Sequence, residues 1–137
     1  MSPIIAASDN AAHDELRRTL MLQVAPGSTK TFVVDIEKTA RVYNNPKYAD
    51  LEVLMVVETP RDVVRLLDLG LDITDVNVGG MTYKENMTRI SEAVSVGKDD
   101  IEAFSELDKR GVRLTLQQLP TNRPVQLMDL LRSKGLL

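Results

Sequence analysis

The stretch from Leu51 to Met81, LEVLMVVETPRDVVRLLDLGLDITDVNVGGM, constrains the fold more than any other part of the chain. Its apolar run Val53 to Val57 is typical of a strand that is buried on both faces of a parallel sheet. A second strand is predicted at about Asp75 to Val78, directly before Gly79-Gly80, the only glycine pair in the sequence. The stretch is therefore predicted to form a strand–helix–strand unit with a ligand loop.

The helix of this unit has marked ends. Thr59 can accept a hydrogen bond from the first free backbone N–H groups, Pro60 suits the first helical position, and Asp62 completes a capping box. Gly70 stands where helices end on a left-handed residue. The apolar face of the helix is predicted to comprise Val63, Val64, Leu66, Leu67 and Leu69.

Two parallel strands joined by a helix form a right-handed crossover, so both strands end on the same edge of one sheet. The outgoing loops, Glu58-Thr59 and Gly79-Gly80-Met81, are therefore expected side by side. Ligands of open α/β sheets bind at this carboxyl edge. A glycine pair lets backbone N–H groups approach an anion, and a helix N-terminus behind a threonine favours phosphate. A plain turn and a plain helix cap are the alternative interpretations.

Strands and helices are predicted to alternate along the rest of the chain. The preceding elements are a strand at Ile4 to Ala7, a helix from Ser8-Asp9-Asn10 to about Val24, a break at Ala25-Pro26-Gly27-Ser28, a strand at Thr31 to Val34 and a helix at Ile36 to Tyr43. The following elements are a loop at Thr82 to Thr88, an extended piece at Arg89 to Val96 with Ile90 and Val94 facing inward, a helix from Lys98 to Gly111, an edge or half-exposed strand at Val112 to Leu116, a connector at Pro120 to Pro124 and a last helix at Val125 to Leu131. This order predicts one α/β domain over residues 1–137, with three layers and a mostly parallel open sheet covered by helices on both faces.

Composition excludes several classes of function. The sequence has no cysteine and one histidine, which rules out a disulfide framework and thiolate or histidine-cluster metal sites. A net charge of -3 and a pI near 5.2 argue against a nucleic-acid partner, since phosphate backbones need clustered Lys and Arg. No stretch approaches the ~20 apolar residues of a membrane span and none resembles a signal peptide, so a cytoplasmic protein is expected.

His13 is the only imidazole, the side chain best suited to carry protons or phosphoryl groups near pH 7. It is predicted in the first turn of a helix, beside Asp14 and Glu15. A surface histidine without a role is the simpler interpretation, as it is for the cations Arg17, Arg18 and Lys84.

The order of these pieces resembles a known family. The chain is similar to the IIB component of the mannose/fructose/sorbose family of bacterial sugar phosphotransferase systems. The similar pieces are, in order, an apolar strand, SDNAAHDELRRTLM, AP, a strand, LMVVETPRDVVRLLDLG, ITDVNVGGMTY and AVSVGKDDIEAFSELDKRGVRLTLQQLPTN. The resemblance runs from about Ile4 to Leu131, and its most specific part is VNVGGM at Val76 to Met81.

The resemblance implies a cytoplasmic phosphocarrier without a cofactor. Such a protein receives a phosphoryl group from the phosphohistidine of a IIA partner and passes it to a sugar held by membrane IIC and IID partners. The phosphate would lie at the carboxyl edge of the sheet, walled by Thr59 and by the loop Asn77, Gly79, Gly80 and Met81. Positioning and N–H donors perform most of the catalysis in phosphoryl transfer.

One family segment has no counterpart in this sequence. The family begins with a strand and a loop of the form D-x-R-L-I-H-G-Q, which supplies the phosphorylated histidine and a phosphate-binding arginine. The first strand here matches the second strand of the family, and His13 matches a helix position, so no catalytic residue is assigned. We therefore expect the 137 residues to be inactive alone.

The absent strand lies in the middle of the family's sheet, and its loss would leave strand edges without backbone partners. A truncated product, direct pairing of the remaining strands, and pairing with a second copy in a homodimer are the alternatives. For the function, the alternatives to a phosphocarrier are a non-catalytic regulatory or binding module, a remnant that keeps the pocket, and a flavodoxin-like phosphate-binding enzyme favoured only by Gly79-Gly80.

Overall fold

The computed structural model describes residues 4–24, 30–48 and 52–137. Contacts divide the chain into two compact units: unit 1 comprises Met1–Glu58 and Arg65–Leu71, and unit 2 comprises Thr59–Val64 and Asp72–Leu137. Each unit is described by itself, and the expected single domain stays a prediction. The predicted helix break at residues 25–28 lies outside the described residues.

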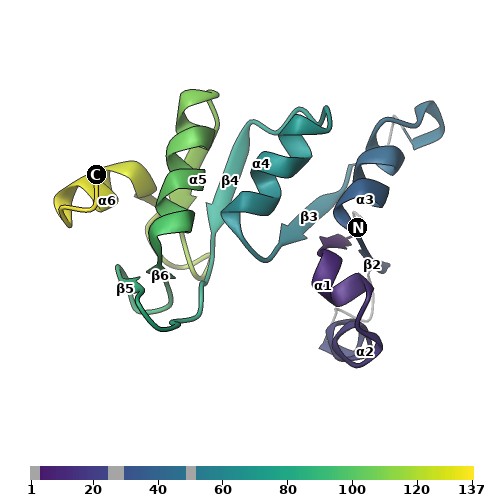
Figure 1. Ribbon diagram of the computed structural model, residues 1–137, viewed down its shortest axis with the longest axis horizontal. Helices are drawn as coiled ribbons and strands as arrows, with labels where there is room; N and C mark the ends of the chain where they lie inside the picture. Colours follow the sequence, from purple (N-terminus) through teal and green to yellow (C-terminus); the bar gives the residue numbers. More distant parts are fainter. Residues whose placement is uncertain (1–3, 25–29, 49–51) are drawn as a thin grey trace. The chain divides into compact units, whose positions relative to one another are not determined.

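Unit 1 is built on a parallel sheet of three short strands (Figure 1). The central strand β1 (Ile4–Ala7) pairs with β2 (Thr31–Val34) on one side and with β3 (Leu54–Val57) on the other. In this register Ile5 lies opposite both Phe32 and Met55. The three predicted strands are thus confirmed to within one residue.

The predicted burial of β3 on both faces is wrong. Leu54 is 58% exposed and Val56 is 47% exposed. Within the described residues β3 pairs only with β1, so it is the end strand of its sheet. An apolar run predicts a strand, but it carries no information on how many neighbours that strand has.

The single helix predicted from Asp9 to Val24 is two helices, α1 (Asp9–Ala12) and α2 (Glu15–Val24). Ser8 caps α1, since its Oγ accepts the Ala11 N–H at 3.1 Å. The chain then leaves the helix at His13, and Asp14 starts a new one by accepting the Arg17 N–H at 3.2 Å through Oδ1. An aspartate that bonds backbone N–H groups locally competes with a continuous helix. The prediction of His13 in the first turn of a helix is therefore wrong, because His13 follows the last turn of α1.

Helix α3 (Ile36–Tyr43) begins at Asp35, whose Oδ1 accepts the Lys38 N–H at 2.7 Å, and its predicted bounds are confirmed. A 3₁₀ turn follows at Pro46–Tyr48. Helix α4 (Pro60–Asp68) is followed, two residues after its end, by Gly70, which has a φ of 101°. The apolar face of α4 is confirmed at Val63, Val64 and Leu66, whereas Leu69 is 41% exposed because it follows the last helical turn.

The Asp9 carboxylate forms two hydrogen bonds that connect different elements of unit 1. Its Oδ1 accepts the Ile36 N–H at 2.9 Å, and its Oδ2 lies 2.7 Å from Arg65 Nη1. The carboxylate thereby joins the start of α1 to the first turn of α3 and to Arg65. The Ile36 hydrogen bond first, and then the Arg65 guanidinium, hold the pKa of Asp9 below its ordinary value of 3.8.

Unit 2 contains a second sheet with the order β4-β7-β8. Strand β4 (Asp75–Val78) pairs in parallel with β7 (Arg113–Leu116), and β7 pairs antiparallel with β8 (Val125–Gln126). The predicted bounds of β4 are confirmed. Strand β7 alternates buried and exposed residues as predicted, but it lies inside its sheet and is not an edge strand.

The prediction that β3 and β4 belong to one sheet is wrong for the pairs the structure describes. Strand β3 pairs within the sheet of unit 1, and β4 pairs within the sheet of unit 2. A right-handed crossover requires both strands in the same sheet.

Two further corrections concern the end of unit 2. The extended piece predicted at residues 89–96 is an antiparallel hairpin of β5 (Thr88–Arg89) and β6 (Ser95–Val96). Ile90 and Val94 are buried, as predicted. The last helix, α6 (Leu127–Ser133), begins two residues later than predicted, because Val125 and Gln126 form β8.

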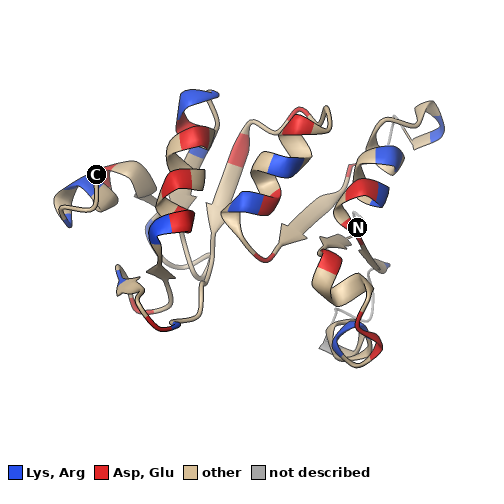
Figure 2. Ribbon diagram, in the orientation of Figure 1, with Lys and Arg blue, Asp and Glu red and all other residues tan. Residues whose placement is uncertain are grey.

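Helix α5 (Lys98–Lys109) supplies much of the core of unit 2. Phe104 and Leu107 are buried, and Gly111, with a φ of 84°, terminates the helix region as predicted. Asp100 accepts the Gly97 N–H at 2.8 Å, so the acidic start of α5 stabilises the positive end of the helix. Along α4 and α5, acidic and basic residues are interspersed (Figure 2). Among the described residues, no helix has both the length and the apolar character of a bilayer-crossing segment.

We predict that Asp9→Ala lowers the free energy of unfolding by about 1 kcal/mol, since the Ile36 N–H loses its partner. Asp9→Asn should cost less, because it can keep that hydrogen bond and loses only an ion pair whose two side chains are 40% and 41% exposed. Because the pKa of Asp9 is lowered in the folded state, its negative charge stabilises the fold above about pH 3.8. This stabilisation is lost as the pH falls through the lowered pKa.

Urea titrations of the wild type and Asp9→Asn at pH 7 and at a pH below 3.8 measure this effect. The difference in the free energy of unfolding between the wild type and Asp9→Asn should be smaller at the lower pH. Glu102→Gln, on the exposed face of α5, is the control and should behave like the wild type at pH 7. A difference that persists unchanged at low pH would rule out the charge as its cause.

Candidate phosphate site at the end of β4

The five residues predicted to wall a ligand site, Thr59, Asn77, Gly79, Gly80 and Met81, all belong to unit 2. Thr59 caps α4, since its Oγ1 accepts the Asp62 N–H at 3.3 Å. In the view of Figure 1, the first turn of α4 and the carboxyl end of β4 point toward the same end of unit 2. Convergence of Thr59 and the glycine pair on one pocket stays a prediction.

Asn77 connects the two parallel strands. Its Nδ2 donates to the Gln117 carbonyl at 3.1 Å, and its Oδ1 accepts from Thr115 Oγ1 at 3.3 Å. Both polar ends of the amide are thus engaged within the sheet, which makes Asn77 a residue that supports the loop after β4.

Two supporting residues, Thr115 and Gln117, were not predicted from the sequence. The Gln117 N–H donates to the Val78 carbonyl at 3.1 Å, and Gln117 Nε2 donates to the Asn122 carbonyl at 2.8 Å. Gln117 therefore ties the exit of β4 to the connector after β7. The alternating pattern of residues 112–116 places Thr115 on the half-exposed face, which is the one clue to its role in the sequence.

Neither glycine of the pair needs a left-handed backbone. The described glycines with positive φ are Gly70, Gly111 and Gly135. A Cβ at Gly79 would lie 3.8 Å from the Gln117 carbonyl oxygen, and one at Gly80 would lie 3.7 Å from the Ala93 carbonyl oxygen. Both are ordinary van der Waals distances, so local backbone geometry does not explain the pair.

Met81 anchors the glycine loop to the hairpin of β5 and β6. The Met81 N–H donates to the Ala93 carbonyl at 2.8 Å, and the Met81 carbonyl accepts the Ser95 N–H at 2.9 Å. The loop is thus held on one side through Asn77 and Gln117 and on the other through Met81. Backbone held in this way is preorganised, as an anion site requires.

His13 belongs to unit 1, whereas the glycine loop belongs to unit 2. Its side chain is 71% exposed, with Nε2 lying 3.8 Å from Asp35 Oδ2. Arg17, Arg18 and Lys84 are exposed as predicted, and Arg17 Nη1 lies 3.9 Å from Glu58 Oε1.

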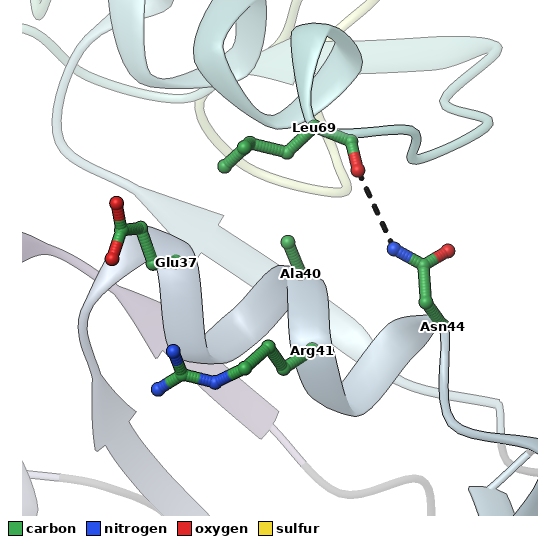
Figure 3. A pocket seen from close by; sticks show the side chains of 5 residues that line it. All are labelled: Glu37, Ala40, Arg41, Asn44 and Leu69. Atoms are coloured by element: carbon green, nitrogen blue, oxygen red, sulfur yellow. Dashed lines mark hydrogen bonds between the residues drawn. The ribbon is translucent and has the colours of Figure 1, made fainter.

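A hollow of about 440 Å³ in unit 1 holds none of the predicted site residues (Figure 3). It lies between α3 and the end of α4, where Asn44 Nδ2 donates to the Leu69 carbonyl at 3.4 Å. Its other lining residues are Glu37, Ala40 and Arg41. Across the described part of the chain, no group of three or more His, Cys, Asp or Glu side chains is placed to hold a metal ion.

Comparison with known proteins decides the family. The family model described as "PTS system sorbose subfamily IIB component" matches residues 1–137. The chain belongs to this IIB family. The resemblance of VNVGGM and the segments around it is thereby confirmed.

Several characterised relatives agree with this assignment. The IIB chain is 46% identical over 131 residues to the "PTS system mannose-specific EIIAB component" of Escherichia coli K12, which covers 96% of this chain and 41% of the relative. It is 39% identical over 130 residues to the "PTS system fructose-specific EIIB component" of Bacillus subtilis, covering 95% of the chain and 80% of the relative. The chain thus spans less than half of the mannose-specific relatives that it matches.

A solved structure shows the same fold. The IIBSor domain of the sorbose permease from Klebsiella pneumoniae aligns with a TM-score of 0.92 and 38% sequence identity, over 96% of this chain and 81% of that one. This likeness confirms the predicted class, a three-layer α/β fold with a mostly parallel sheet and helices on both faces.

We predict that Gly79→Ala and Gly80→Ala leave the free energy of unfolding within about 0.5 kcal/mol of the wild type, since an added Cβ meets no clash. Gly70→Ala should lower it by about 1–2 kcal/mol, because alanine disfavours a φ of 101°. Chemical denaturation of the three variants measures both effects. A large loss for Gly80→Ala would mean that the loop needs its glycines for folding.

Proposed function

We propose that the chain forms the phosphate-binding sheet edge of a sugar phosphotransferase IIB phosphocarrier. The observation that carries this proposal is the family match over all 137 residues, together with the glycine loop that Asn77, Gln117 and Met81 hold in place. Backbone N–H groups of Gly79 and Gly80 would bind the phosphoryl oxygens, and Thr59 with the start of α4 would complete the wall.

In this proposal the phosphoryl group comes from a phosphorylated IIA partner and leaves to a sugar bound by membrane IIC and IID partners. The reaction would take place in the cytoplasm. The name of the Escherichia coli relative, an EIIAB component, supports a IIA partner, since it joins the two functions. Selectivity for one sugar would lie largely with the membrane partners.

The nucleophile is the part of the relay that these residues do not supply. His13 is the only histidine of the sequence and it belongs to unit 1, on an exposed turn. We propose that phosphoryl transfer requires a D-x-R-L-I-H-G-Q segment, carried either on a longer form of the chain or by another polypeptide. An exposed, uncharged end strand, β3, also favours association with a second copy as a homodimer.

A second candidate function is a non-catalytic binding or regulatory module that keeps the same sheet edge. The absence of a histidine other than His13 from the sequence favours it. The two proposals differ in what happens when the missing segment is restored.

We predict that the 137-residue chain, incubated with phosphorylated IIA, gains no acid-labile phosphate. The same chain extended at its N-terminus by the strand and the D-x-R-L-I-H-G-Q segment of a family member should become labelled. Radiolabel on acid and neutral gels measures both results. His13→Asn serves as the control and should change neither.

Label on the unextended wild type that disappears in His13→Asn would make His13 the nucleophile and overturn the assignment. An extended chain that folds but stays unlabelled would favour the non-catalytic module. The intact mass of the natural protein shows independently whether it carries such a segment.

A further inference from the structure

A second hollow, of about 410 Å³, lies beside the glycine loop and entirely within unit 2. Pockets for small molecules measure about 300–1,000 Å³. The hollow is formed where the chain after Met81 meets the β5–β6 hairpin, which lies beyond the carboxyl end of β4 in Figure 1. It is lined by Met81, Thr82, Tyr83, Arg89, Glu92, Ala93 and Ser95.

Arg89 brings a fixed positive charge to this hollow. Its Nε donates to the Ser91 carbonyl at 3.2 Å and its Nη2 donates to the Glu92 carbonyl at 2.9 Å. Within the described residues the guanidinium forms no ion pair with a carboxylate, so its charge is balanced only by carbonyl dipoles. The guanidinium is held in place by these two hydrogen bonds, and its remaining N–H groups are suited to bind phosphate oxygens.

Ser95 brings a hydroxyl group without a partner. The residue is 3% exposed, and its Oγ forms no hydrogen bond to any residue that the structure describes. A hydroxyl group on the wall of a hollow can donate a hydrogen bond to a polar ligand and accept one from it. Thr82 and Tyr83 add two more hydroxyl groups without described partners, and the Tyr83 ring, 62% exposed, adds a flat apolar wall.

We propose that this hollow binds a phosphorylated sugar, with the phosphate on Arg89 and the sugar hydroxyls on Ser95, Thr82 and Tyr83. One cation with several hydroxyl groups and an aromatic ring matches a ligand that is anionic at one end and hydroxylated along the rest. The Glu92 carboxylate, also on the wall, repels a phosphate and keeps the affinity low.

This binding involves no phosphoryl transfer and no histidine. It rests on the contacts of the hollow alone, so it can fail without affecting the proposed relay, and the relay can fail without affecting it. A free sugar phosphate bound next to Gly80 would compete with a phosphoryl group on the glycine loop, which would couple the carrier to the product of uptake.

The test is an NMR titration of the ¹⁵N-labelled chain with mannose 6-phosphate up to about 10 mM, a range that detects millimolar dissociation constants. Mannose and inorganic phosphate are titrated separately. With the sugar phosphate, we expect saturable chemical-shift changes of the amides from Met81 to Val96. Mannose alone and inorganic phosphate alone should each bind at least several-fold more weakly.

Variants then assign the contacts. Arg89→Met should weaken binding about tenfold, whereas Arg123→Met, which removes an exposed charge elsewhere in unit 2, should leave it unchanged. Ser95→Ala should weaken binding about threefold without a loss of stability, since Ser95 Oγ has no partner to lose. Glu92→Gln should tighten binding.

Three results of the titration would overturn the proposal. They are no saturable shift at the highest concentration, equal binding of inorganic phosphate and the sugar phosphate, and shifts that map outside residues 81–96. Because Arg89→Met could loosen the hairpin by losing two carbonyl contacts, Ser95→Ala and Glu92→Gln decide the question if that variant does not fold. No change in affinity in either of them would also overturn it.

Discussion

The parallel pairing of β4 with β7 is the interaction on which the candidate site depends. It places Val78 opposite Leu116, so that both strands end at the same level and their outgoing loops meet. Asn77 and Gln117 then reinforce the ends of the two strands with bonds from one strand to the other. Since the glycine pair follows β4 directly, its position is set by hydrogen bonds that do not involve the glycines themselves.

Elements with local sequence cues were predicted well. The helix predicted at Ile36 to Tyr43 is α3 at its observed bounds, and Thr59 and Gly70 marked the ends of the α4 region. These cues are side chains that bond or bend the backbone within a few residues, so they need no knowledge of the rest of the fold. The break between α1 and α2 was missed because Asp14 is as acceptable inside a first helical turn as it is at a new cap.

The positions of strands within their sheets could not be predicted in the same way. Strand β3 was expected to be buried and is an end strand, whereas β7, expected to be an edge or half-exposed strand, lies between two neighbours. Pairing is decided by segments far away in the sequence. The same reason explains why the glycine loop was found and its supports were not: Asn77 and Gln117 are 40 residues apart. The family resemblance supplied the proposed function, which the pattern alone could not.

The sheet of unit 1 ends on a strand without a charged residue, Leu54–Val57. Among the described strands none pairs with its outer side, so a further strand can be added there without breaking a described bond. Association through this edge should therefore increase with protein concentration. A lysine or a proline on an edge strand disfavours pairing with another chain, and β3 contains neither.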